Sequence, residues 1–254
     1  MKLPAAHASS TEFRNATGSS VPKEFAMEAR KNPDVIKEMA ETPEEKRELE
    51  KEALARQYIL ICDRSGSMSW PDGNTTRWES ARLAVEKLVE KMFLYDTDGK
   101  VPLYLFDNNV EFVGECTSSG QVVKVFKDYQ PGGTTDLAKC LEVAMNTYVG
   151  KQRTNWSVVP GTTFVVILDG DVDDRQAVKD VIIKYADPAN GFIENHSNIG
   201  ISFVQVGNDK GATAFLKDLD DGVIGTPDIC DFKLDNFLSE KDGVDRLLYD
   251  AIFD

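Results

Sequence analysis

The chain has few of the side chains that build histidine-based sites. Only two histidines, His7 and His196, occur in 254 residues, and they lie far apart in the sequence. A zinc site or a catalytic triad that depends on histidine is therefore not expected.

Cysteine is also scarce, and its spacing fits no metal or redox motif. Cys62, Cys116, Cys140 and Cys230 form no CxxC pair, and Cys62 lies within an apolar run, which is typical of a small buried side chain. A chain of this length buries enough surface to fold without disulfides. We therefore expect free thiols and a reducing, cytoplasmic location.

Long hydrophobic runs are missing as well. No apolar run approaches the ~20 residues that a membrane-spanning helix needs, and residues 1–10 lack the apolar segment of a secretory signal. The net charge of −14 disfavours nucleic acid and anionic membranes as partners. The same charge suits cation binding.

Three regions of the chain differ in composition and in their secondary-structure signals. Residues 1–20 are rich in Ser, Thr and Ala, which predicts a disordered or loosely attached terminus. Residues 21–56 carry helix signals, among them Thr42-Pro43-Glu44-Glu45, in which a threonine N-cap precedes a proline and two acids. The helix that follows Thr42 is highly charged and has few core candidates. We expect a solvated surface helix, with docking at the sheet edge or on another subunit as alternatives.

Residues 57–254 alternate between two patterns. Short apolar runs predict strands at 58–62, 101–106, 110–113, 162–168, 199–206 and 228–234, and amphipathic stretches predict helices at 77–95, 121–128, 136–149, 174–186, 212–218 and 240–253. This alternation predicts an α/β domain with a doubly wound, mainly parallel sheet and helices on both faces. The turn at 107–109 would make 110–113 an antiparallel edge strand.

Polar clusters follow two of these strands, and a third lies in the glycine-rich segment between the predicted helices at 121–128 and 136–149. They are Asp63-Arg64-Ser65-Gly66-Ser67, Gly132-Gly133-Thr134-Thr135-Asp136 and Asp169-Gly170-Asp171. In such sheets ligands bind at the carboxyl ends of the strands. Donors that are all oxygen favour a hard cation, Mg²⁺, Mn²⁺ or Ca²⁺, over zinc. Polar turns and helix N-caps are the simpler explanation of the same residues, and Arg64 could either steer an anionic partner or pair with a nearby acid.

Together the clusters resemble the three-part metal-ion-dependent adhesion site of von Willebrand factor A domains. The resemblance covers residues 57–254, and Thr76-Arg77-Trp78-Glu79 is similar to bacterial-type stand-alone members. It implies five metal ligands: Asp63, Ser65, Ser67, Thr134 and Asp169. We prefer Thr134 to Thr135 because it directly follows the glycine pair. Leu168 and Asp136 depart from the family, which often has Thr at the first position and Thr or Ser at the second.

The resemblance implies a protein-binding module that holds Mg²⁺, with Ca²⁺ or Mn²⁺ as alternatives, and reaches an Asp or Glu of another protein through the ion. Two other functions stay open: a metal-dependent hydrolase, and a structural domain in which the ion only stabilises the loops. No histidine lies in any motif, and neither a nucleophile elbow nor a GxxxxGK[ST] loop occurs, so we do not expect an enzyme. Asp136 and Asp171 are the only candidates for a general acid or base. With Thr135, they would lie just outside the metal ligands.

Overall fold

The computed structural model describes residues 21–152, 161–222 and 226–253. Within these ranges six strands form one sheet in the order β5-β4-β1-β6-β7-β8. Their bounds are Gln57–Asp63 (β1), Val101–Phe106 (β4), Val110–Cys116 (β5), Thr162–Leu168 (β6), Ile199–Gln205 (β7) and Cys230–Leu234 (β8). Neighbouring strands are parallel except β4 and β5, which are antiparallel. The predicted α/β class with one antiparallel edge strand is confirmed.

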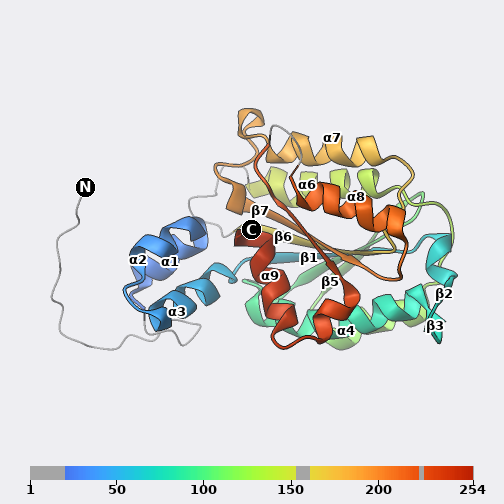
Figure 1. The fold of residues 1–254 in the computed structure, drawn as a ribbon, viewed down its shortest axis with the longest axis horizontal. Helices are drawn as coiled ribbons and strands as arrows, with labels where there is room; N and C mark the ends of the chain where they lie inside the picture. Colours follow the sequence, from blue (N-terminus) through green and yellow to red (C-terminus); the bar gives the residue numbers. More distant parts are fainter. Residues whose placement is uncertain (1–20, 153–160, 223–225, 254) are drawn as a thin grey trace.

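Helices cover both faces of this sheet (Figure 1). One face carries α6 (Leu137–Gln152), α7 (Arg175–Ala186) and α8 (Lys210–Asp220), and the other carries α4 (Arg77–Tyr95), α5 (Ser119–Asp128) and α9 (Gly243–Phe253). None of the helices in the described ranges is long and apolar enough to cross a membrane.

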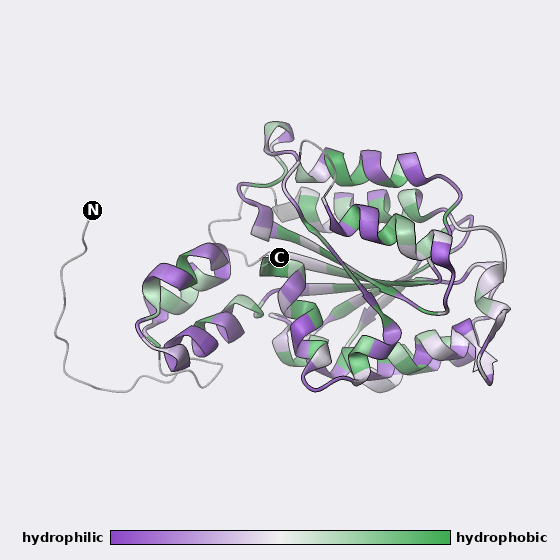
Figure 2. Cartoon of the chain, in the orientation of Figure 1, coloured by the Kyte–Doolittle hydropathy of each residue, from purple (hydrophilic) through white to green (hydrophobic). Residues whose placement is uncertain are grey.

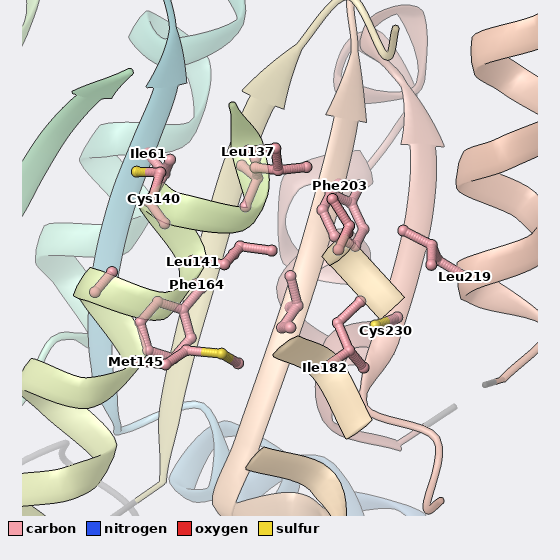
Figure 3. Packing of buried hydrophobic residues seen from close by; sticks show 14 of the residues in the cluster. Ile61, Leu137, Cys140, Leu141, Met145, Phe164, Ile182, Phe203, Leu219 and Cys230 are labelled. Atoms are coloured by element: carbon pink, nitrogen blue, oxygen red, sulfur yellow. The ribbon is translucent and has the colours of Figure 1, made fainter. Parts of the chain in front are cut away.

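The central strands are buried because helices pack on both of their faces. Every residue of β4, β6 and β7 is buried, whereas the edge strand β5 is mostly half-exposed or exposed. On the face covered by α6, Figure 3 shows Leu141 and Met145 close to Phe164 of β6. Figure 2 shows mainly green central strands and helices that mix green and purple. Two-sided burial explains why these strands appear in the sequence as continuous apolar runs.

Three short helices precede the sheet: α1 (Lys23–Lys31), α2 (Ile36–Met39) and α3 (Pro43–Ala53). The predicted helix start is confirmed, because Thr42 Oγ1 accepts a hydrogen bond from Glu45 N (3.1 Å) and Glu45 Oε2 accepts one from Thr42 N (3.0 Å). The predicted loose terminus, residues 1–20, lies outside the described residues.

These helices have a small core of their own and contact the end of the chain. Its buried members are Val21, Ala26, Ala29, Ile36, Leu49 and Ala53, and Phe253 of α9 packs against them. Tyr249 of α9 also donates a hydrogen bond to Glu50 Oε1 at 3.0 Å. The charged helix α3 is therefore packed on one side and is not solvated all round, as its few apolar residues had led us to expect.

Candidate metal centre

The first polar loop begins where the buried strand β1 ends. Asp63 and Ser65 are both buried, with exposed fractions of 0% and 1%, and Ser67 is half-buried. Ser65 N donates to Asp63 Oδ1 at 2.7 Å, and the hydroxyl oxygens of Ser65 and Ser67 lie 3.0 Å apart. The loop therefore presents one carboxylate and two hydroxyls at the carboxyl end of a central strand.

The second loop is joined to the first by backbone atoms. Gly66 N donates to Gly133 O at 3.1 Å, and Gly132 N donates to Arg64 O at 2.8 Å. Gly133 has a φ of +79°, and a Cβ there would lie 2.4 Å from Asn108 Oδ1. Glycine is thus required at this position by both the backbone conformation and the available space.

The third loop follows β6 and is joined to the second. Asp173 N donates to Thr135 O at 3.0 Å, and Thr135 N donates to Asp173 Oδ2 at 3.1 Å. Strand β6 is the parallel neighbour of β1, with Cys62 opposite Ile167. Asp63 and Asp169 therefore end adjacent strands at the same edge of the sheet, and Asp169 is only 1% exposed.

The two carboxyl groups interact electrostatically. Burial, and to a lesser degree the nearby Asp169 carboxylate, raise the pKa of Asp63 to about 8, although hydrogen bonds from Ser65 and the Asp169 backbone act in the opposite direction. Within the described parts of the chain, Asp63 Oδ2 and Asp169 Oδ1 are buried without a hydrogen-bond partner. Buried carboxylate oxygens normally have hydrogen-bond partners, so these two oxygens lack a donor or a cation.

A pocket of about 280 Å³ opens beside these groups. Its lining comprises Ser65, Ser67, Trp70, Arg77, Gly133, Thr134, Thr135, Asp169, Asp171, Val172, Asp173 and Asp209. The described residues contain no group of three His, Cys, Asp or Glu side chains placed for a metal. The donors here are instead two carboxylates and several hydroxyls, a set that fits a hard divalent cation and not zinc.

The structure separates the other candidate residues by position. Thr134 is exposed in the pocket, whereas Thr135 beside it is buried. Asp136 accepts a hydrogen bond from Lys139 N at 3.1 Å and so caps α6 rather than lining the pocket. Asp171 lines the pocket but is exposed, with Arg175 Nη2 3.6 Å away.

Arg64 does not face the pocket as an unpaired cation. Its guanidinium contacts Asp107 Oδ2 at 2.8 Å and Glu111 Oε2 at 3.0 Å, and it lies over the ring of Tyr129. Of the two roles that the sequence left open, the structure shows the ion pair with nearby acids.

One residue of the site was missed in the sequence. Arg77 Nη1 donates to Asp169 Oδ2 at 2.6 Å, and its guanidinium carbon lies 5.2 Å from the ring centroid of Trp70. A hairpin of β2 (Pro71–Asp72) and β3 (Thr75–Thr76) brings these two residues together, with Arg77 N donating to Trp70 O. The sequence analysis named Arg77 only within the Thr76-Arg77-Trp78-Glu79 string and gave it no role in the site.

The chain matches a family model in sequence and solved proteins in fold. Residues 58–170 match the family model described as the von Willebrand factor type A domain. The VWA domain of SpRpn10 has a similar structure, with 14% identity, a TM-score of 0.53, and coverage of 71% of this chain and 87% of that chain. The manganese-loaded TRAP protein of Plasmodium vivax is 13% identical, with a TM-score of 0.50 and coverage of 72% and 70%.

At such low identities the two structures show a common fold and nothing more. No curated protein matches the sequence. The family match begins in β1 and ends just after β6, so it contains the two strands that carry Asp63 and Asp169. The chain therefore carries a domain of the von Willebrand factor type A family.

Proposed function

We propose that this domain binds a divalent cation, Mg²⁺ first, and through it a carboxylate of another protein. Asp63, Ser65, Ser67, Thr134 and Asp169 would hold the ion. Such an ion would act as a Lewis acid to which the carboxylate of a partner's Asp or Glu could bind. Mn²⁺ and Ca²⁺ use similar oxygen donors, and the TRAP structure with the same fold is manganese-loaded.

The observation that carries this proposal is the pair of unsatisfied oxygens, Asp63 Oδ2 and Asp169 Oδ1. They belong to buried carboxyl groups on adjacent strand ends, next to the Ser65 and Ser67 hydroxyls and a pocket. Two buried carboxyl groups that repel each other are costly, and Arg77 pairs with only one of them. A divalent ion would offset that repulsion.

Binding is favoured over turnover because the acids that line the pocket are already engaged or exposed. Asp169 pairs with Arg77, Asp173 accepts a hydrogen bond from Thr135 N, and Asp209 caps a helix. The pocket lining contains neither His nor Cys among the described residues. Of the two acids considered for acid–base chemistry, Asp136 caps a helix, and Asp171 is exposed near Arg175. A hydrolase would need one of them beside the reacting atoms.

A purely structural ion is also less favoured. The three loops are already connected by backbone hydrogen bonds between Gly66 and Gly133, Gly132 and Arg64, and Asp173 and Thr135. These bonds hold the loops together without any metal ligand. We therefore expect chelation to abolish ligand binding while leaving the fold intact.

The surroundings in which the domain works are proposed from its charge and thiols. All four cysteines are free and buried, which agrees with the expectation of free thiols and supports a reducing, cytoplasmic location. The net charge of −14 supports a protein partner rather than nucleic acid or an anionic membrane.

The proposal is tested with the full chain, Mn²⁺ and three proteins. Mn²⁺ binding is followed by the loss of the free-ion spin-resonance signal in wild type, Asp63→Ala and Asp171→Asn. We expect stoichiometric binding by wild type and by Asp171→Asn, which changes only an exposed acid of the pocket rim, and loss of binding in Asp63→Ala.

Partner binding is then measured by capture from a lysate in Mg²⁺, with elution by EDTA. A partner retained by wild type and Asp171→Asn, but not by Asp63→Ala, supports the proposal. Equal retention by Asp63→Ala and wild type, or no Mn²⁺ binding by wild type, would overturn it.

A further inference from the structure

The ion pair between Arg77 and Asp169 lies inside the proposed metal site. Asp169 keeps one oxygen, Oδ1, without a hydrogen-bond partner, while the other, Oδ2, accepts from Arg77 at 2.6 Å. The side chain of Arg77 is 12% exposed and that of Asp169 is 0% exposed. A guanidinium is always charged in a protein, so this positive charge is a fixed part of the site.

The position of Arg77 is set by several independent contacts. It is the first residue of α4, whose N-cap Thr76 accepts from Glu79 N at 3.2 Å. The β2–β3 hairpin places the Trp70 ring against the guanidinium. On another side, a Cβ added to Gly207 would come within 3.0 Å of Arg77 Nε. The side chain is therefore confined and remains aimed at Asp169.

The charges at this point determine what an ion would present to a ligand. Asp63 and Asp169 with Arg77 carry one net negative charge when both acids are ionised. A divalent cation then leaves one net positive charge, which attracts a carboxylate. Without Arg77 the same cluster with its ion would be neutral. The other acids of the pocket have a smaller electrostatic effect on an ion, because solvent screens the exposed Asp171, Asp173 and Asp209.

We propose that Arg77 makes the metal-loaded site selective for anionic ligands, at the expense of affinity for the ion itself. This inference rests on the proposed function of the site. Arg77 repels a divalent cation and attracts the incoming carboxylate, so its charge affects the two affinities in opposite directions. It also engages Asp169 Oδ2, which leaves Oδ1 as the oxygen of that carboxylate that could face an ion.

The test uses Arg77→Gln, which keeps a hydrogen-bond donor but removes the charge, and Arg77→Lys, which keeps the charge. Mn²⁺ affinity is measured by spin resonance. Acetate affinity of the Mn²⁺-loaded protein is measured by the relaxation of water protons, which falls when acetate replaces bound water. For Arg77→Gln we expect about tenfold tighter Mn²⁺ binding and about tenfold weaker acetate binding. Arg77→Lys should lie close to wild type in both.

Arg175→Gln is the matched control, since it removes a positive charge from the rim near Asp171 and not from the ion site. Both affinities should stay within about twofold of wild type. A merely structural role for Arg77 would weaken Mn²⁺ and acetate binding together, and that result would overturn the inference, as would two unchanged affinities. If wild type binds no Mn²⁺, the proposed function itself fails. If wild type binds both probes and Arg77→Gln behaves like it, only the inference fails.

Discussion

Asp63 illustrates how a single buried residue of the proposed metal site lowers the stability of the fold. Burial raises its pKa to about 8, well above the 3.8 of a solvated aspartate, and the Asp169 carboxylate adds to the rise. In the absence of metal the folded state therefore holds this proton up to a higher pH than the unfolded state does. The group's contribution to stability is fully present below about pH 4 and is lost as the pH rises towards 8.

Asp63→Asn should remove that loss, because asparagine stays neutral and still accepts the hydrogen bond from Ser65 N. In EDTA we expect the variant to be more stable than wild type, with a gain that grows from pH 4 to pH 8. The gain should reach on the order of 5 kcal/mol at pH 8. Urea unfolding at pH 4, 6 and 8 measures it. A gain that does not depend on pH would contradict the assigned cause.

Alanine substitutions at the two adjacent glycines of the second loop should differ in their cost to stability. Gly133→Ala forces a Cβ against Asn108 at a φ of +79°, so a cost of about 2 kcal/mol or more is expected, together with weaker Mn²⁺ binding. Gly132→Ala meets nothing within 4 Å, and its φ lies outside the positive region. Its stability should stay within about 1 kcal/mol of wild type. Thermal unfolding of both variants tests this, and equal losses would argue against local strain at Gly133.

At the scale of helices and strands, much of the fold was predictable because burial leaves an apolar pattern, which is periodic in amphipathic helices and continuous in strands buried on both faces. The predicted bounds of α4, β4 and β6 agree with the structure at both ends. Ends that depend on local turns were less accurate: β5 runs to Cys116, beyond the predicted residue 113. Its half-exposed residues weaken the apolar signal that located the buried strands.

The candidate site was predictable only in part. Parallel strands bring Asp63 and Asp169 to one edge of the sheet, and that follows from the order of the motifs. The ion pair between Arg77 and Asp169 spans 92 positions of sequence, and no local pattern encodes such a contact. The β2–β3 hairpin that sets Trp70 against Arg77 was missed for a related reason. Its strands are two residues each, too short to show a period.

The N-terminal helices form an element whose stability can be separated from that of the sheet. Leu49 is 1% exposed in the small core shared by α1, α2 and α3. Leu49→Ala should cost about 2–5 kcal/mol locally. Hydrogen exchange should then lose protection in residues 23–53, while β1 and β6 stay protected.

Leu83→Ala is the control for that experiment, because the same substitution falls on a side chain of α4 that is 42% exposed. It should leave exchange nearly unchanged throughout. Loss of protection in β1 and β6 as well as in the helices of Leu49→Ala would show that the two cores unfold together.

At the scale of the whole molecule, the distribution of thiols tests how completely the domain is packed. Cys62 and Cys140 are fully buried, while Cys116 and Cys230 are 6% and 5% exposed. Burial raises the pKa of all four thiols, which lowers the thiolate fraction that reacts.

We expect a disulfide reagent such as Ellman's to modify the native protein slowly, and all four cysteines rapidly in 6 M guanidinium (about the concentration that unfolds most domains). Cys116 should react first in the native state, since it is the most exposed. Native rates that match the denatured rates would contradict the packed core described above.

The backbone hydrogen bonds that join the three loops also affect how such a site can change in evolution. Peptide groups make these bonds, and the donor hydroxyls and carboxylates that face the pocket take no part in most of them. Exchange of Ser65, Ser67 or Thr134 for other side chains would leave the loops connected. The fold can therefore outlast the proposed ion site, and a descendant that has lost every proposed ligand can offer the same pocket to a different chemistry.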